Sequence, residues 1–310
     1  MSFELTDQTV VVVTGASSGI GRAIALAFAV KRVRLVLIAR NLEPLNEVAA
    51  GCRALGATAL VQTIDIADPA GVDEALKQAV EQFGRIDVWV NCAAVLLFGP
   101  FEEIPEDVFN QVIHTNIIGY ANGCRAALKQ FRSQGNRGVI VDMSSMLGVV
   151  PEPYVSAYVA TKFAVRGLTA CLRQEHRRFP NIHICTVLPF AIDTPIYCKA
   201  GNYYGFEARS IVPVYSPERV ARGVLRLAER PKREMRVGGL AHLLDLASRA
   251  APGLTEALVG RFAPSLQFKS SAMGKTSGNL LESTGPYAVA GGWMEYWAER
   301  ILPGRRTARK

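Results

Sequence analysis

Short apolar runs alternate with longer amphipathic stretches along the first 240 residues of the chain. Runs of four to seven residues predict buried strands, and the stretches between them predict crossover helices. The expected strands span residues 9–13, 34–39, 58–64, 86–90, 138–143, 182–188 and 234–237. This alternation favours an α/β fold with a doubly wound parallel sheet of about seven strands and helices on both faces.

The pattern changes beyond residue 240, where leucines recur at helical spacing and no further strand is indicated. Two amphipathic helices, divided near Pro252 and Gly253, explain this spacing. We therefore expect a domain over residues 1–240. The remainder, 241–310, is expected to be an extension, helical and then flexible, that is not an independent domain.

A glycine-rich turn joins the first expected strand to a helix. Residues 14–21 read Thr-Gly-Ala-Ser-Ser-Gly-Ile-Gly, and an apolar helical stretch follows. Backbone amides at such a helix start can hold a pyrophosphate. Gly15 would allow the tight turn, Gly19 a close backbone approach and Gly21 close helix packing. A glycine cluster alone is more often a loop, but here both flanks fit a nucleotide site.

Tyr158 and Lys162 lie four residues apart, so one helical turn places both side chains on the same face. An ammonium near a phenol lowers the pKa of the phenol, which predicts an acid/base unit that acts near neutral pH. The spacing alone is weak evidence, because any helix with a buried Tyr and a Lys that reaches solvent shows it. Ser145, at the end of the expected strand 138–143, adds a hydroxyl at a strand end.

Taken together, these residues resemble the short-chain dehydrogenase/reductase family, in the group with Thr-Gly-x-x-x-Gly-x-Gly and Tyr-x-x-x-Lys motifs. The resemblance covers about residues 7–240. It implies a Rossmann-like fold and a nicotinamide-dependent oxidoreductase that acts on a carbonyl or secondary alcohol. The residues that carry it, in the family's order and spacing, are Thr14 to Gly21, Asp65, Asn91 to Ala94, Asn116, Ser145, Tyr158, Lys162, and Pro189 to Thr194.

The resemblance implies four catalytic residues. Tyr158 would donate a proton to the carbonyl oxygen, or accept one from an alcohol, while Ser145 would hydrogen-bond that oxygen. Lys162 would bind the nicotinamide ribose and lower the pKa of Tyr158, and Asn116 would support a chain of waters that carries protons out. Hydride transfer builds negative charge on the substrate oxygen, so such donors make chemical sense.

The resemblance also implies a set of cofactor-binding residues. They are Gly15, Ser17, Ser18, Gly19, Ile20, Gly21, Arg40, Asp65, Ile66, Asn91, Ala93, Tyr158, Lys162, Pro189, Ile192 and Thr194. Two positions depart from the family pattern, since Ala94 and Phe190 stand where the family usually has glycine. The alanine lies near the expected adenosine ribose, and the phenylalanine either shapes the substrate pocket or fills space.

The second expected strand indicates which nicotinamide cofactor is bound. An acidic residue at its end would bind the 2′-hydroxyl of NAD, but Ala39 provides no acid. Arg40 instead offers charge-assisted hydrogen bonds to the 2′-phosphate of NADP. We expect NADP(H) to be preferred over NAD(H) by about tenfold or more. The alternative is that Arg40 is only an exposed residue at a strand end.

Aromatic residues gather between Pro195 and Pro213, with glycines that predict a mobile segment. In the family this region closes over the substrate, so its aromatic content implies an apolar ligand. The alternative is a pair of helices packed on the core. The expected substrate pocket consists of Phe190, Tyr203, Tyr204 and Phe206.

Composition excludes several other classes of protein. Hydrophobic residues make up 49% of the chain, and no apolar run approaches the eighteen or so residues that span a membrane. The first residues lack a leader pattern, and six scattered cysteines predict reduced core thiols, so a cytoplasmic enzyme is expected. The four histidines show no metal-ligand spacing, so no metal is expected. The net charge of +8 is dispersed, apart from a few clusters such as the basic tail 305–310, and indicates no nucleic-acid partner.

The remaining expectations concern partners and the extension. A homodimer or homotetramer would form through helices around 106–132 and 157–178, where many relatives pair.

The stretch 269–286 predicts a flexible connector, and the aromatics expected to anchor the chain end are Trp293, Tyr296 and Trp297. The apolar faces of the two extension helices must be covered. We favour packing on the protein, where the extension would cover the substrate cleft or a subunit edge. Contact with a membrane surface is the less favoured alternative.

Two other classes of function compete with this interpretation. One is a non-catalytic NADP-binding structural or sensor protein on the same fold, since a fold does not establish a function. The complete set of Asn116, Ser145, Tyr158 and Lys162 argues against it. The other is an epimerase or dehydratase of the related extended group, which the glycine spacing disfavours.

Overall fold

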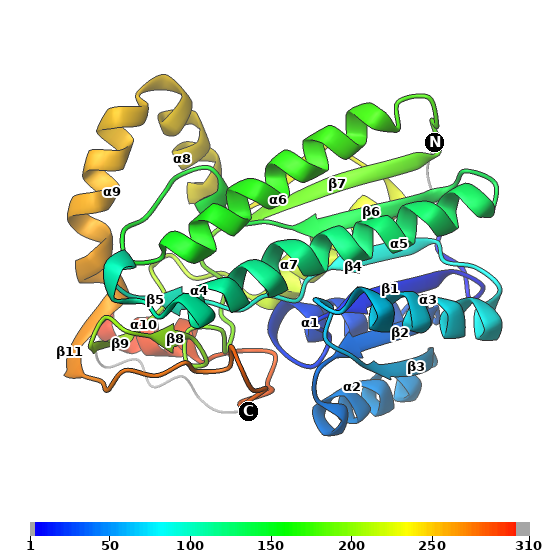
Figure 1. Ribbon diagram of the computed structural model, residues 1–310, viewed down its shortest axis with the longest axis horizontal. Coiled ribbons are helices and arrows are strands. Elements are labelled where there is room, and N and C mark those ends of the chain that lie inside the picture. Colours follow the sequence, from blue (N-terminus) through cyan, green and yellow to red (C-terminus); the bar gives the residue numbers. More distant parts are fainter. Residues whose placement is uncertain (1–3, 302–310) are drawn as a thin grey trace.

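A seven-stranded parallel sheet forms the centre of the molecule in the computed structural model, which describes residues 4–301 (Figure 1). The strands lie in the order β10-β7-β6-β4-β1-β2-β3, and every neighbouring pair is parallel. Their bounds are β1 (Val10–Thr14), β2 (Arg34–Ala39), β3 (Thr58–Thr63), β4 (Val88–Asn91), β6 (Gly138–Met143), β7 (Ile182–Pro189) and β10 (Glu234–Val237). The predicted parallel sheet is confirmed, with each strand within two residues of its expected bounds.

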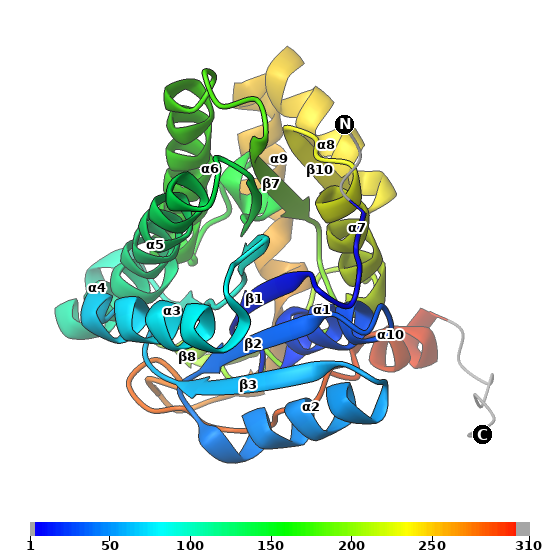
Figure 2. The same cartoon turned by 90° about the vertical axis from the view of Figure 1, so that its right-hand side faces the viewer.

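Helices cover both faces of the sheet, which explains why its inner strands consist mostly of apolar residues. One face packs against α1 (Gly19–Ala29), α2 (Leu42–Ala54) and α7 (Pro217–Glu229). The other face packs against α3 (Pro69–Phe83), α5 (Gly119–Ser133) and α6 (Ser156–Glu175). Figure 2 shows the two helical layers on either side of the sheet. All five residues of β1 and all six of β6 are buried, as expected for strands enclosed between helices.

Smaller elements surround the carboxyl edge of the sheet. α4 (Glu106–Ile113) continues through a π-helical turn at His114–Ile118 into α5, and short 3-10 turns lie at Phe101–Glu103 and Met146–Gly148. β5 (Leu97–Phe98) pairs in parallel with β8 (Gly201–Asn202). These short strands connect the loop after β4 to the segment that follows β7.

The extension contains the two predicted helices, α8 (Gly239–Ala250) and α9 (Pro252–Gln267), and they are divided where expected. The sequence suggested that the segment after them is a flexible connector, but part of this segment is regular. It begins as β11 (Phe268–Ala272), which pairs antiparallel with β9 (Phe206–Ala208), and it returns past the carboxyl edge of the sheet to α10 (Trp293–Ile301). The expected basic tail at 305–310 lies outside the described residues.

The aromatic residues of α10 anchor this end of the described chain, as expected. Trp293 is buried, and its indole nitrogen donates a hydrogen bond to the Thr194 carbonyl at 3.1 Å. The indole nitrogen of Trp297 donates to the Ser210 carbonyl at 2.8 Å. Both partners belong to the segment that follows β7. The end of the extension is therefore held beside the catalytic domain.

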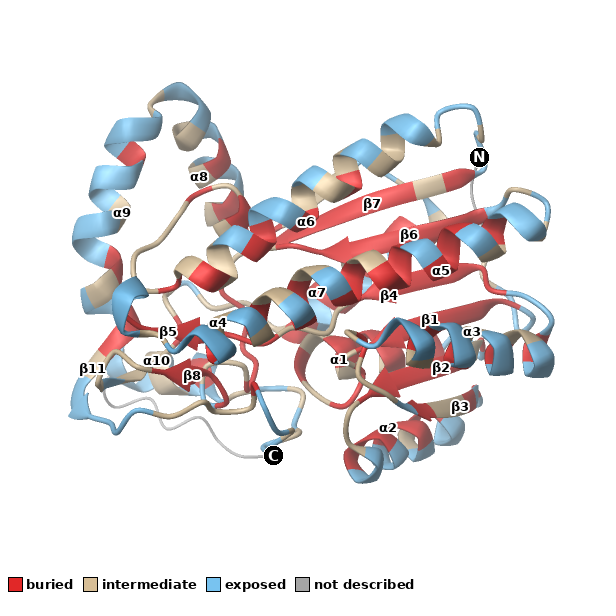
Figure 3. Cartoon of the chain, viewed as in Figure 1, coloured by how far each residue is buried: buried red, intermediate tan, exposed pale blue. Residues whose placement is uncertain are grey.

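The apolar faces of α8 and α9 pack on the described chain only in part, since Ala241 and Leu244 of α8 lie against Met146 and Leu188 while most of the leucines are exposed. Leu243, Leu246 and Leu254 expose 61%, 65% and 62% of their surface, and Leu258 and Phe262 are also exposed. In Figure 3 both helices are mostly pale blue, and in Figure 1 they stand apart from the helices on the sheet. Within residues 4–301, no helix is both long and apolar enough to cross a bilayer.

Candidate active site and cofactor cleft

A cleft of about 250 Å³ lies at the carboxyl edge of the sheet. Its walls are the loops that follow β1, β2, β3, β4, β6 and β7, together with parts of the extension. Open parallel sheets bind ligands at this edge, because the strand order reverses there and leaves a crevice between the loops.

The glycine turn after β1 needs glycine for two different physical reasons. Gly15 and Gly19 have φ values of +67° and +54°, which side chains with a Cβ rarely adopt. A Cβ on Gly21 would lie 2.2 Å from the Gly15 carbonyl oxygen, so α1 could not begin so close to the turn. A Cβ on Gly15 would also lie 2.6 Å from the Cα of Ala93. The turn thus brings the helix start against the loop after β4.

Most of the residues expected to bind the cofactor line this cleft. They are Gly15, Ser17, Ser18, Gly19, Ile20, Gly21, Arg40, Asp65, Ile66, Ala93, Tyr158, Lys162, Pro189, Ile192 and Thr194. The lining also includes Ala94 and Phe190, the two residues that depart from the family pattern.

Two expected site residues lie beneath the cleft, where they hold other groups. The side chain of Asn91 is fully buried, accepting a hydrogen bond from Trp89 and donating one to Asp142, each at 2.8 Å. The side chain of Asn116 is also buried. It accepts from the amide of Val95 and donates to its carbonyl, both at 2.9 Å. Asn116 therefore fixes the loop after β4, and neither side chain lines the cleft.

Three of the four expected substrate-pocket aromatics lie elsewhere. The ring of Tyr204 stacks on Phe268 of β11 with centroids 3.9 Å apart, and Phe206 is exposed on β9. Tyr203 packs in a cluster with Leu97. None of the three lines the cleft, whereas Phe190 does. The pairing of β9 with β11 accounts for the position of Tyr204, whose ring is directed at Phe268 of the extension.

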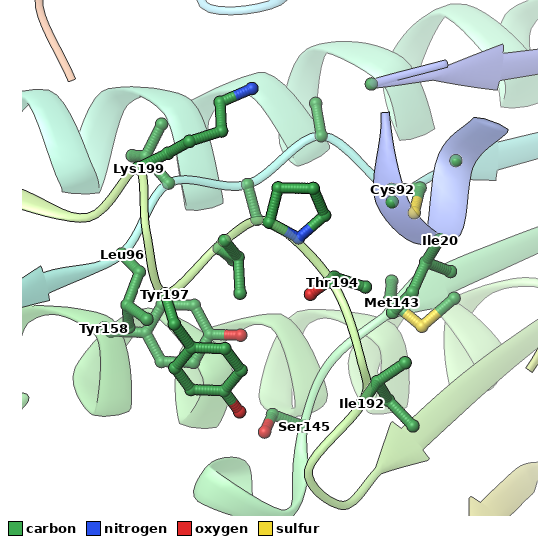
Figure 4. A pocket seen from close by; sticks show the side chains of 18 of the residues that line it. Ile20, Cys92, Leu96, Met143, Ser145, Tyr158, Ile192, Thr194, Tyr197 and Lys199 are labelled. Atoms are coloured by element: carbon green, nitrogen blue, oxygen red, sulfur yellow. The ribbon is translucent and has the colours of Figure 1, made fainter. Parts of the chain in front are cut away.

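Ser145, Tyr158 and Lys162 meet in the cleft, although they come from two elements. Ser145 follows β6, and its hydroxyl accepts a hydrogen bond from the Leu147 amide at 3.1 Å. Tyr158 and Lys162 project from the first turns of α6, and the ammonium lies 5.2 Å from the centroid of the Tyr158 ring. Figure 4 shows the hydroxyls of Ser145 and Tyr158 near one another, with that of Tyr197 beside them.

The electrostatics of this group differ from the sequence expectation. Burial raises the pKa of Tyr158 far above its ordinary value, although Ser145 acts to lower it. The Lys162 ammonium is directed at the Met143 carbonyl, to which it donates a hydrogen bond at 2.9 Å. Burial also lowers the pKa of Lys162 to about 8. The lowered pKa expected for Tyr158 is not seen in this structure, where burial favours the protonated phenol, which can donate a proton.

Sequence reasoning missed several residues in the cleft wall. Lys199 and Tyr197 come from the segment after β7, and Glu152 comes from the loop before α6. Gln267 at the end of α9 and Asn279 beyond β11 belong to the extension. No motif marks these positions. The Pro-Glu-Pro sequence at 151–153 was the one available signal, since it places a charge on a stiff backbone.

The extension crosses the part of the cleft that lies over β2 and the glycine turn. The Arg40 guanidinium donates to the carbonyls of Asn279 and Leu280 at 2.6 and 2.9 Å. The Gly19 amide donates to the Ala288 carbonyl at 2.9 Å. Two groups expected to contact a cofactor are thus in contact with the extension. Arg40 has five N–H donors, of which these bonds use two.

The chain shows clear similarity to characterised and uncharacterised proteins alike. Residues 9–202 match the family described as short chain dehydrogenase. An uncharacterized oxidoreductase, YxnA, of Bacillus subtilis is 34% identical over 258 residues, which cover 83% of this chain and 72% of that protein. A 3-ketodihydrosphingosine reductase of Bos taurus is 29% identical over 258 residues, covering 81% and 77%.

Solved structures agree with the fold. A short chain dehydrogenase from Mycobacterium paratuberculosis bound to NAD aligns with a TM-score of 0.67 and 22% identity, over 76% of this chain and 97% of that chain. An alcohol dehydrogenase from Thermococcus sibiricus complexed with 5-hydroxy-NADP aligns with a TM-score of 0.65 and 28% identity, over 74% and 95%.

Proposed function

The chain belongs to the short-chain dehydrogenase family, and we propose that it is an NADP(H)-dependent oxidoreductase for an apolar carbonyl or secondary alcohol. Family membership makes it an NAD(P)-dependent oxidoreductase that acts on CH–OH or C=O groups. The observation that carries the proposal is the meeting of Ser145, Tyr158 and Lys162 in the same cleft as the glycine turn.

The proposed chemistry divides the work between the cofactor and the chain. A bound nicotinamide supplies or accepts the hydride. Tyr158, held as a phenol by burial, donates its proton to the substrate oxygen as negative charge develops there, and Ser145 donates a hydrogen bond to the same oxygen. In the reverse direction Tyr158 accepts the proton of the alcohol.

Lys162 and Asn116 support this chemistry from behind the reacting groups. An ammonium has three N–H donors, and Lys162 uses one on the Met143 carbonyl, so two are left for the ribose hydroxyls of the cofactor. Asn116 holds the backbone of Val95, which lines the cleft. We propose that it positions this loop and the chain of waters expected from the family pattern.

The preference for NADP(H) is supported by two cations in the cleft wall. Arg40 follows β2, and Ala39 before it provides no acid. Lys199 also lines the cleft, and its pKa is lowered to about 8 by burial and by the positive charge of Arg40. Within residues 4–301 no carboxylate pairs with either cation, and two such cations within electrostatic reach of each other favour an anion between them, such as the 2′-phosphate.

An apolar substrate is supported by the lining beside Ser145 and Tyr158. Its side chains include Leu96, Phe98, Met146, Phe190, Ile196 and Ile211. The relative named as a 3-ketodihydrosphingosine reductase favours a carbonyl on a long apolar chain as one class to test.

Two measurements test this function. Dissociation constants of NADPH and NADH should differ by about tenfold or more in favour of NADPH, and Arg40→Ala should remove most of the difference. Equal affinities in the wild-type protein would refute the preference. Loss of NADPH absorbance is then followed with a panel of ketones, aldehydes and quinones. Tight NADPH binding without turnover of any of them would favour the alternative of a non-catalytic NADP-binding protein.

We propose further that the enzyme is a homodimer, or a tetramer of such dimers, built through α5 and α6. Phe163 of α6 and Ile118 just before α5 are both exposed, which supports an interface there. Sedimentation at micromolar concentration that shows a single monomeric species would reject it. A cytoplasmic location is likewise proposed, and six free cysteines support it.

We also propose that residues 241–301 are part of the catalytic unit and not an independent domain. The support is the set of hydrogen bonds that join the extension to the cleft. Besides the contacts of Arg40 and Gly19, the Asp193 carboxylate accepts from the amides of Gly291 and Trp293 at 2.9 and 2.8 Å.

A further inference from the structure

Glu152 is an acidic side chain in the wall of the cleft that the mechanism does not use. It lies in the loop between the turn Met146–Gly148 and α6, and it lines the same cleft as Ser145 and Tyr158. Pro151 and Pro153 flank it. Proline fixes its own φ and restricts the residue before it, so the backbone at Glu152 has few conformations available.

The loop is also anchored just beyond the second proline. Tyr154 adopts a φ of +64°, which is uncommon for a residue other than glycine. Its carbonyl accepts a hydrogen bond from the Gly99 amide at 2.8 Å, and its ring contacts Tyr204 with centroids 4.5 Å apart. Unusual backbone of this kind persists where the surroundings enforce it, and it clusters at ligand sites. The backbone that bears Glu152 is therefore held in place before any ligand arrives.

The Glu152 carboxyl has no partner of its own. Among the described residues, no side chain or amide donates a hydrogen bond to it and no cation pairs with it. Burial alone raises its pKa to about 7. The side chain is only half-buried, so water reaches the carboxyl until a ligand fills the cleft and displaces that water. An acceptor that is then left without a donor is unfavourable. A ligand with a suitable donor would relieve that cost.

Tyr197 connects this carboxyl to the reacting groups. Burial raises the pKa values of Tyr197 and Tyr158, and the charges of Glu152 on Tyr197 and of Tyr197 on Tyr158 add smaller increases, so neighbouring members of this series lie within electrostatic reach. Figure 4 shows the hydroxyl of Tyr197 beside those of Tyr158 and Ser145. Because all four residues line one cleft, a substrate held by Ser145 and Tyr158 lies in a cleft whose wall also contains Tyr197 and Glu152.

We propose that Glu152, together with Tyr197, binds a second polar group of the substrate, a hydroxyl or ammonium that donates a hydrogen bond to the carboxylate. The substrate class is then an apolar carbonyl or alcohol that carries an additional hydrogen-bond donor near the reacting carbon. This inference rests on the proposed function, because it assigns the group that reacts to Ser145 and Tyr158.

The test compares three alcohols of one chain length, octan-2-ol, octane-1,2-diol and 1-aminooctan-2-ol, with NADP⁺ and the full-length protein. The wild-type kcat/KM should be higher by about tenfold or more for the diol, the amino alcohol or both, because a buried acceptor discriminates against a ligand that leaves it unpaired. Glu152→Ala should abolish that advantage through a higher KM with little change in kcat, since the contact is remote from the transferred hydride. Oxidation of octan-2-ol should change by less than about threefold.

Two further variants separate the possible sources of an effect. Glu152→Gln removes the charge and keeps the shape, so it should lower the advantage of the amino alcohol more than that of the diol. Glu256→Gln removes the same charge from the exposed face of α9 and should leave all three substrates unchanged. Melting temperatures establish that each variant is folded.

The outcomes distinguish this inference from the proposed function. An unchanged advantage in Glu152→Ala, or no advantage of either substituted alcohol over octan-2-ol in the wild type, overturns the inference and leaves the function standing. If no alcohol is oxidised, binding of the three compounds to the NADP⁺ complex is measured by calorimetry. A Glu152-dependent preference for the substituted alcohols then supports the polar subsite, while the absence of turnover counts against the function.

Discussion

Helices α7 and α9 have apolar stripes at similar spacing, yet the stripe of α7 is buried and that of α9 is exposed. In α7, Val220, Val224 and Leu227 are buried against the sheet. In α9, Leu254, Leu258 and Phe262 face outward. Spacing within a helix is a local property, whereas cover for its apolar face comes from residues distant in the sequence. Periodicity therefore predicts that a helix forms, but it does not predict which residues cover the apolar face of that helix.

The cleft also has one wall that local sequence patterns predict and one wall that they do not. The walls built by the loops after the strands contain short motifs whose residues are close in sequence, such as the glycine turn and the pair on α6. The wall built by the extension contains Gln267, Asn279 and Ser283, which belong to no motif. The chemistry is therefore expected to depend mainly on the core, and the fit of cofactor and substrate on both parts.

The largest effect expected is that of Tyr158→Phe, which tests whether the core alone supplies the chemistry. General acid catalysis contributes about a hundred- to ten-thousand-fold to rate, so turnover should fall by that amount. NADPH affinity should stay within a few-fold, because only the transferable proton is lost. Lys162→Ala should reduce both turnover and NADPH affinity. Retention by Tyr158→Phe of more than a tenth of the wild-type kcat would contradict the assignment.

A matched pair of leucine substitutions tests the comparison of α7 with α9 directly. Leu227→Ala should lower the free energy of unfolding by about 2–5 kcal/mol, because it leaves a cavity between α7 and the sheet. Leu258→Ala on the exposed face should change it by less than about 0.5 kcal/mol. Urea unfolding of both variants provides the measurement. A similar loss for the two would show that α9 is covered in solution, for example by a second copy.

A smaller effect is expected from truncation after Gly239, which removes the extension and keeps all seven strands. Without Asn279, Leu280 and Ala288, the contacts to Arg40 and Gly19 are lost, so the affinity for NADPH and the range of substrates should change by about tenfold or less. Solubility should rise as the exposed stripe disappears. Circular dichroism checks the fold of the truncated chain, and identical affinity, substrate range and solubility would reject a role of the extension in the cleft.

Sequence reasoning predicted the parallel sheet well because each buried strand is a short apolar run. It located Ser145, Tyr158 and Lys162 because their spacing follows from one strand end and one helical turn. It failed for the pKa of Tyr158, since no pattern shows that Lys162 is directed at the Met143 carbonyl while burial acts on the phenol. It failed for Tyr204 because its partner, Phe268, lies 64 residues away in the extension. Glu152 was overlooked because a single carboxylate in a loop has no spacing to reveal it.

Transfer of deuterium tests the central claim most directly. NADPH labelled with deuterium at C4 of the nicotinamide, on each face in turn, is incubated with the protein and a carbonyl from the panel, and the alcohol product is examined by mass spectrometry. The account predicts one deuterium on the former carbonyl carbon from one labelled face only, and about a hundredfold less labelled alcohol, or less still, from Tyr158→Phe in the same time. Binding of NADPH with no labelled alcohol from any carbonyl would contradict it.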